Sequence, residues 1–162
     1  MIPIALPPNR PGIIEFSQPT GQSDEAVRLR KIVEEIRGQQ SVRACFADLE
    51  AACLEAGVGD WDGHRAKALE EGSKRNAQYL LGALLLIAPG PEVTVDADGE
   101  VEFDWLTSSD RALTLSISGE GRLTYAWRDG ARRGHGTEWF SGSIPATLAA
   151  AIAEVTRDGR SA

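Results

Sequence analysis

Residues that catalysis and metal binding use most often are scarce in this chain. Its 162 residues include only two histidines, His64 and His135, and two cysteines, Cys45 and Cys53. Zinc sites need three or four such ligands close together, and the spacing of these residues provides no such set. The chain also lacks a phosphate-cradling glycine loop, a Gly-x-Ser-x-Gly turn and a Cys–His pairing that spacing supports. We therefore expect no metal, no cofactor and no catalytic residue.

The two cysteines cannot form a disulfide with each other if they share a helix, as their surroundings predict. Eight residues of α-helix rise about 12 Å, whereas a disulfide requires Cα atoms within about 7 Å. Two reduced, buried thiols are typical of a reducing compartment. The first residues contain no basic region followed by an apolar one, so no signal peptide is expected. The sequence therefore predicts a cytoplasmic protein.

Positive charge and long apolar runs are also scarce. The formal net charge is -7. Nucleic acids and anionic membranes are bound by clustered Lys and Arg, so both are disfavoured as partners. The longest apolar run, YLLGALLLIA, is about half the length of a membrane span. We expect a protein partner or a homo-oligomer, with no nucleic acid and no membrane.

Prolines are concentrated in the first 22 residues, which contain five of the eight in the chain. Proline fixes φ and lacks an N–H donor, so residues 1–22 are predicted to form an extended arm. Two interpretations stay open: a flexible arm, or an arm that docks on a partner or a second subunit. Its apolar residues would serve the second: Ile2, Ile4, Leu6, Ile13, Ile14 and Phe16.

Apolar residues at three- and four-residue spacing predict helices between residues 23 and 88. Ser23 and Gly38 have the types expected at the start and end of the first helix, over 23–38. A second is predicted over 41–56, and the two are alternatively one long helix broken at Gly38. A third, from residue 67 or 73 to residue 88, is the most apolar segment, so we place it in the core.

From residue 92 the apolar period changes to two, which predicts strands. Five runs, EVTV, EVEFDWL, RALTLSIS, RLTYAWR and GHGTEWF, span 92–140 and are joined by short turns typical of hairpins. Their alternation predicts an antiparallel meander with one covered face, and a last helix follows over 145–157. The prediction is an α+β fold in which helices cover one face of the sheet, forming a single domain of residues 23–158 after the arm.

The predicted sheet carries its charges in two groups. Acidic residues alternate from Asp96 to Asp104 with no basic residue among them. The later strands carry four arginines: Arg122, Arg128, Arg132 and Arg133. Glu102 and Asp104 would pair with these only if their strands are close. Two interpretations stay open: a solvated polar face, or a recognition surface on which Tyr125 or Trp139 anchors a partner.

The stretch GDWDGHRAKA, residues 59–68, lies between two predicted helices. Its aspartates and glycines are turn and cap residues, so it is predicted to be a joint with Trp61 as a lid over the helix ends. A functional alternative makes His64, beside Asp62, a general acid or base.

That alternative would make the protein a small hydrolase or nucleotide-binding enzyme. It would use His64, Asp62 and His135 with the loop that holds Arg132 and Arg133. Acid–base groups act at hydrogen-bond distance, so these side chains must converge in one pocket.

The motifs DWDG, APGPEV, DADGEVEFDW, LTLSIS, GRLTYAW and GHGTEWF follow one another between residues 60 and 148. This order resembles a group of small, uncharacterised bacterial proteins with a Trp-Asp-Gly element, a helix, a proline turn and a hairpin meander. The resemblance implies a shared fold element at residues 61–63 and supplies no catalytic residues. His64 and Arg65 depart from it, since an aromatic and a small residue are more usual there.

These observations favour a non-enzymatic, cytoplasmic protein-interaction module: antitoxin-like, inhibitory or an accessory subunit. A homo-oligomer assembled through the arm is a further alternative. The candidate partner-binding residues are Trp61, Asp62, His64, Tyr125, Arg128, Arg132, Arg133, His135 and Trp139.

Overall fold

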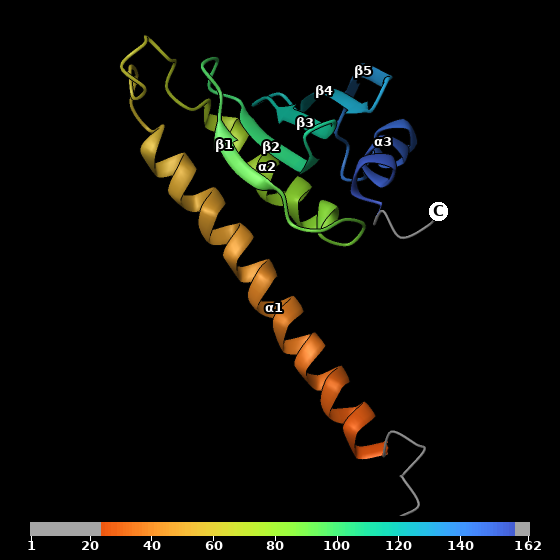
Figure 1. Ribbon diagram of the computed structural model, residues 1–162. Coiled ribbons are helices and arrows are strands. Elements are labelled where there is room, and N and C mark those ends of the chain that lie inside the picture. The colour runs from red at the N-terminus through yellow and green to blue at the C-terminus, as the bar shows by residue number, and fades with distance from the viewer. Residues whose placement is uncertain (1–23, 158–162) are drawn as a thin grey trace, which may run out of the picture. The chain divides into compact units, whose positions relative to one another are not determined.

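The computed structural model describes residues 24–157, and the predicted arm of residues 1–22 lies outside them (Figure 1). The chain divides into two units after Glu35, and each is described by itself. The elements within this described range comprise three helices and a five-stranded antiparallel sheet, with helices at both ends of the order. The predicted α+β class is confirmed. None of the helices within 24–157 combines the length and apolar character of a membrane span.

Helix α1 (Asp24–Glu55) is continuous, so the predicted separation into two helices at Gly38 is wrong. An interior glycine weakens a helix by roughly 1 kcal/mol, but it ends one when it takes the left-handed conformation. Gly38 does not have a positive φ, and the helix passes through it. In the first unit, apolar side chains of α1 are 44–57% exposed: Val27, Leu29, Ile32 and Val33.

The part of α1 in the second unit contributes one row of side chains to the core. Cys45, Leu49 and Cys53 are buried at four-residue spacing, which places them on one face of the helix. Both cysteines are free, as predicted. Burial raises the pKa of both thiols, chiefly by removing water from the thiolate form.

The sheet is a meander in which each strand pairs with its sequence neighbour, as predicted. Its strands are β1 (Glu92–Val95), β2 (Val101–Ser108), β3 (Arg111–Ile117), β4 (Arg122–Asp129) and β5 (Arg132–Trp139). Phe103, Leu115 and Tyr125 lie in one cross-strand row on the buried face, which we call the inner face.

Helices α2 (Glu71–Leu84) and α3 (Ala146–Thr156) cover the inner face, as predicted. α2 contacts β2 and β3, while α3 contacts β2, β3 and β4. Their fully buried side chains join the sheet's apolar residues in one core cluster: Leu80, Leu81, Leu84, Leu148, Ile152 and Val155. Both apolar helices thus occupy one side of the sheet.

Two glycines of β5 make room for aromatic rings of β4 on the inner face. A Cβ at Gly136 would lie 2.5 Å from Tyr125 Oη, and one at Gly134 would lie 2.7 Å from Trp127 Nε1. These separations are well inside van der Waals contact, so the rings pack directly on glycine backbone. The glycines explain how a strand of sequence RRGHGTEW closes over large rings.

Candidate interaction surface

The side of the sheet opposite the helices is polar. Its side chains alternate along each strand with those of the inner face, and we call it the outer face. It comprises Glu92, Thr94, Glu102, Asp104, Leu106, Ala112, Thr114, Ser116, Arg122, Thr124, Ala126, Arg128, Arg133, His135, Thr137 and Trp139. At its centre Thr124 and Ala126 are exposed, as are His135 and Thr137 on β5.

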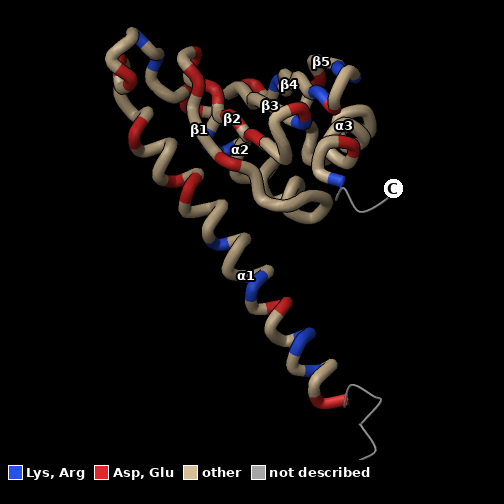
Figure 2. The backbone as a smooth tube through the Cα atoms, viewed as in Figure 1, with Lys and Arg blue, Asp and Glu red and all other residues tan. Residues whose placement is uncertain are grey.

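Charge on the outer face is sorted by strand. Glu92, Glu102 and Asp104 make β1 and β2 acidic, and neither strand has a basic residue (Figure 2). β3 contributes only Ala112, Thr114 and Ser116 there. The basic residues lie on β4 and β5: Arg122, Arg128, Arg133 and His135. The face therefore has an acidic half and a basic half on either side of a neutral strand.

Glu100, just before β2, pairs with Arg122 of β4, but the carboxylates of Glu92, Glu102 and Asp104 have no such partner within residues 24–157. Asp104, Thr114, Ala126 and His135 occupy one row across β2 to β5, and three strand spacings amount to about 14 Å. An ion pair requires side-chain N and O atoms within about 4 Å, and within residues 24–157 none joins Glu102 or Asp104 to an arginine. The ion pairs of Glu102 and Asp104 with the arginines, expected only if their strands were close, are therefore not formed.

The arginines of β4 have other partners. Arg122 pairs with Glu100 at 2.8 Å, and Arg128 donates to the Ser109 carbonyl oxygen at 2.7 Å. Within residues 24–157, four charged or titratable side chains of the outer face make no hydrogen bond or ion pair: Glu92, Glu102, Arg133 and His135. Both halves thus retain groups with no protein partner among the described residues.

Like groups are also crowded together on each half. Partial burial, and then the nearby Asp104 and Asp96 carboxylates, raise the pKa of Glu102 above its ordinary value. Arg128 and Arg133 occupy directly opposite positions on β4 and β5. Like charges directly opposite each other in a sheet are destabilising. The isolated chain therefore holds electrostatic repulsion that an oppositely charged surface would relieve.

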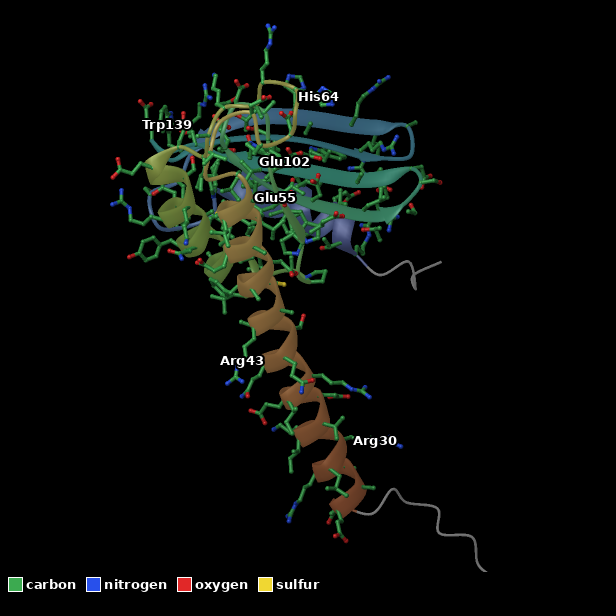
Figure 3. All side chains as sticks on the ribbon, turned by 90° about the vertical axis from the view of Figure 1, so that its left-hand side faces the viewer. Arg30, Arg43, Glu55, His64, Glu102 and Trp139 are labelled. Atoms are coloured by element: carbon green, nitrogen blue, oxygen red, sulfur yellow. The ribbon has the colours of Figure 1, made fainter. Side chains whose placement is uncertain are left out.

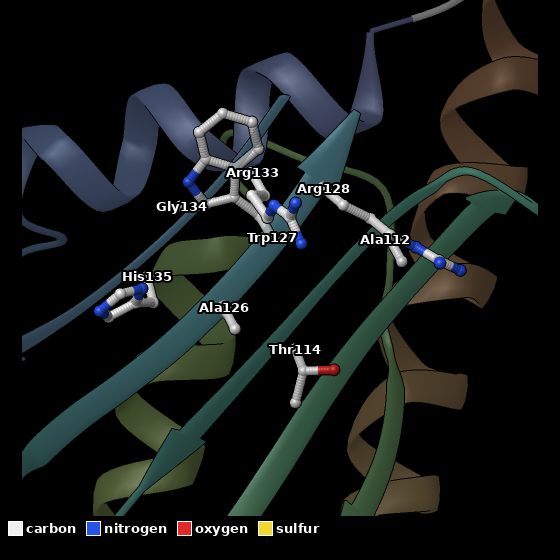
Figure 4. Close-up of a pocket in the computed structure, with 8 residues that line it drawn as sticks. All are labelled: Ala112, Thr114, Ala126, Trp127, Arg128, Arg133, Gly134 and His135. Atoms are coloured by element: carbon white, nitrogen blue, oxygen red, sulfur yellow. The ribbon is translucent and has the colours of Figure 1, made fainter. Parts of the chain in front are cut away.

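A depression of about 700 Å³ lies over the basic half (Figure 4). Its lining residues are Ala112, Thr114, Ala126, Trp127, Arg128, Arg133, Gly134 and His135. Small side chains on β3 and β4 form its floor, while Arg128, Arg133 and His135 stand around it. The hollow therefore lets another surface approach the sheet backbone closely between charged groups.

Four of the predicted binding residues share the outer face: Arg128, Arg133, His135 and Trp139. The Trp139 side chain is 60% exposed, opposite Arg122 in the register. Such an exposed indole is the kind of side chain that anchors interfaces.

Tyr125 and Arg132 lie on the helix side of the sheet instead. Tyr125 is buried, and its hydroxyl donates to Glu138 Oε1 at 3.3 Å. Arg132 pairs with Glu154 of α3, and its guanidinium carbon is 5.9 Å from the Trp127 ring centroid. Because alternate residues face opposite sides of a strand, Arg132 and Arg133 cannot act together on one face.

The loop over residues 59–66 is held by its own side chains. Asp60 Oδ1 accepts from the Arg65 N–H at 2.8 Å, and Asp62 Oδ1 accepts from the N–H groups of His64 and Ala66 at 2.7 and 3.1 Å. The hydrogen bonds from the His64 and Ala66 N–H groups lower the pKa of Asp62, and the bond from His64 has the larger effect. The loop thus has the turn structure expected of a joint.

Trp61 turns inward in this loop. Its ring is half-buried against the core, and Nε1 donates to the Lys67 carbonyl oxygen at 3.2 Å. His64 is exposed in the same loop (Figure 3). The depression contains His135 and Arg133 but neither His64 nor Asp62. The groups required by the enzymatic alternative therefore do not line this hollow together.

Sequence reasoning missed the small residues as parts of the surface, and it placed Glu102 in the acidic group without naming it as a binding residue. Ala112 and Thr114 alternate with Leu113 and Leu115, so their placement on the outer face was readable from the period. The hollow itself depends on which strands lie side by side, for which the period carries no signal.

No protein-family model matches this chain, and comparisons with the curated proteins and with the solved structures find no match. The resemblance to the small bacterial proteins with a Trp-Asp-Gly element stays a prediction. Within residues 24–157, no three His, Cys, Asp or Glu side chains are grouped as a metal site would require.

Proposed function

We propose that this protein is a non-enzymatic protein-interaction module and that the outer face of its sheet is the contact surface. The observation that carries the proposal is the sorting of unpaired charge into two halves around a floor of small side chains. In this role the protein is an antitoxin-like, inhibitory or accessory cytoplasmic subunit that acts by holding or occluding its partner.

A merely solvated face would be expected to place opposite charges next to each other. Cross-strand pairs of opposite charge stabilise a sheet by about 0.2–1 kcal/mol, and like pairs destabilise it. Here Arg128 faces Arg133, and Glu102 is crowded by Asp104. This arrangement of like charges lowers the stability of the isolated chain and would favour binding to an oppositely charged surface, which supports a role in binding.

The shape of the face supports the same role. Exposed Ala126 and Thr124 present little side-chain bulk, so a partner can reach the sheet without displacing long side chains. Trp139 at the margin supplies a large apolar surface that is 60% exposed. A neutral centre with an aromatic anchor and charged margins is a frequent composition of protein interfaces.

The experiment compares two alanine-to-arginine variants of the full chain. Ala126→Arg places a long side chain on the outer face, and Ala150→Arg places the same side chain on an exposed position of α3. Complexes are recovered from the producing cells through an affinity tag, with a second, differently tagged copy also present. We expect Ala126→Arg to reduce recovery of the bound protein at least tenfold and Ala150→Arg to leave it unchanged.

Equal recovery with both variants would contradict the proposal. So would the absence of any bound protein, including the second copy, from the unsubstituted chain. Circular dichroism and a thermal melt of each variant check that a loss of binding is not a loss of folding.

A further inference from the structure

The outer face is complementary to itself. Its acidic half lies on β1 and β2, its basic half on β4 and β5, and the neutral β3 lies midway between them. In a twofold dimer the same patch of both subunits forms the interface. The direction of the twofold axis decides whether the acidic half of one copy lies over the acidic or the basic half of the other.

Consider two sheets packed face to face with a twofold axis running along β3 in the interface. The rotation keeps positions along the strands and exchanges the two sides, so β5 of one copy lies over β1 of the other. His135 then faces the row of Asp104 and Glu92 across the interface, and Arg133 lies one row away. An axis perpendicular to the strands would instead place acid over acid. Only the first arrangement is attractive.

The neutral centre permits the approach that this packing needs. Aligned sheets pack about 10 Å apart, and Ala112, Thr114 and Ser116 of β3 lie on the axis with side chains small enough for that separation. Strands about 4.8 Å apart and 25 Å long make a face of roughly 550 Å² per copy, so about 1,100 Å² is buried in total. That is at the low end for specific interfaces, which implies a weak, salt-sensitive dimer.

We propose that the partner of the outer face is a second copy of this chain, bound face to face about a twofold axis along β3. This inference rests on the proposed function, because it names the partner of the same surface. Arg128 and Arg133 of one copy then lie one row from Asp104 and Glu92 of the other, so the crowded arginines gain carboxylates across the interface. The dimer thus relieves the repulsion between the two arginines.

The test uses two charge-reversal variants of the full chain, Arg133→Glu and Glu92→Arg, because these two residues lie one row apart across the proposed interface. The first places an acidic side chain in the basic half, and the second places a basic side chain in the acidic half. Neither variant should pair with itself, but the two should pair with each other. Both proteins remain net negative, because the chain starts at -7 and each change alters the charge by two, so overall attraction cannot explain their pairing.

Molar mass is measured by multi-angle light scattering over a concentration series at low and high salt. We expect the unsubstituted chain to dimerise at low salt and to shift toward monomer at high salt. Each single variant should raise the dimer dissociation constant at least tenfold, and an equimolar mixture should recover dimer. Arg75→Glu, on the exposed side of α2, is the matched control and should dimerise normally.

A dimer that persists in Arg133→Glu, or a mixture that stays monomeric, would overturn the inference. A monomeric unsubstituted chain would overturn it too. In that case a loss of some other bound protein by Ala126→Arg would leave the proposed function standing. If Ala126→Arg changes no interaction, the proposed function itself fails, so the two failures can be told apart.

Discussion

Neutralising Arg133 is predicted to make the isolated protein more stable while weakening its association. Arg133 lies directly opposite Arg128, and no side-chain partner compensates it within residues 24–157. Arg128 is held by its bond to the Ser109 carbonyl in the turn between β2 and β3, so Arg133 is the member of the pair that is free to move. Arg133→Gln removes this repulsion and keeps a long polar side chain on the exposed strand.

The magnitude follows from the geometry of the pair. The Cβ atoms of directly opposite residues are about 5 Å apart. If the guanidinium groups are about 7 Å apart, they repel by roughly 0.6 kcal/mol at the dielectric constant of water. A Debye length of about 10 Å at 0.1 M salt halves this. Arg133→Gln should therefore stabilise the monomer by about 0.3–0.6 kcal/mol, which is about 1–2 °C in Tm.

The assay is thermal and urea unfolding of dilute protein at several salt concentrations. Arg133→Lys is the control because it keeps the charge, and it should give no gain. The gain of Arg133→Gln should be largest at low salt and should disappear near 1 M salt, where the Debye length is about 3 Å. A destabilised Arg133→Gln, or a gain that is independent of salt, would refute the electrostatic reasoning.

Three further substitutions test the packing and the charges of the sheet. Gly136→Ala should destabilise by about 1–3 kcal/mol in urea unfolding, because its Cβ would lie 2.5 Å from Tyr125 Oη; in a Tyr125→Leu background most of this loss should vanish. Gly72→Ala should lower stability at least as much, since its Cβ would lie 2.2 Å from the Gly119 carbonyl oxygen, a backbone atom that cannot rotate away as a side chain can. An unchanged melting temperature would contradict the close approach. Glu102→Gln should stabilise by less than about 1 kcal/mol at pH 7. The raised pKa of Glu102 means that the folded state favours its protonated form, so wild-type stability falls as pH rises above 4.5. The advantage of Glu102→Gln should therefore be lost below pH 4.5, and a gain that persists there would count against this cause.

The secondary structure of the sheet was predictable because its alternation is strict. Leu113, Leu115 and Ile117 are separated by polar residues, and all three are fully or almost fully buried. The helices were less predictable at Gly38. The low helix propensity of glycine favours a break at this position. Gly38 does not adopt the left-handed conformation that would end the helix, so the helix continues.

The candidate site was predictable only in part, because it depends on which strands are neighbours. The sequence identifies acidic and basic groups, but β3 separates Glu102 from the arginines of β4, and this follows from the sheet order. The alternation of the strand predicts that Tyr125 faces inward, because it lies two residues after the buried Leu123. The direction of Trp61 was not, since it depends on a hydrogen bond to the Lys67 carbonyl in a loop without periodicity.

The most direct measurement of the central claim is photo-crosslinking from the middle of the outer face in the producing cells. A photoreactive amino acid replaces Thr124 in one version of the full chain and Ala150, on the exposed side of α3, in another. The account predicts a protein adduct from position 124, with a second copy of the chain as its main component, and little from position 150. No adduct from position 124, or equal yields from both positions, would contradict it.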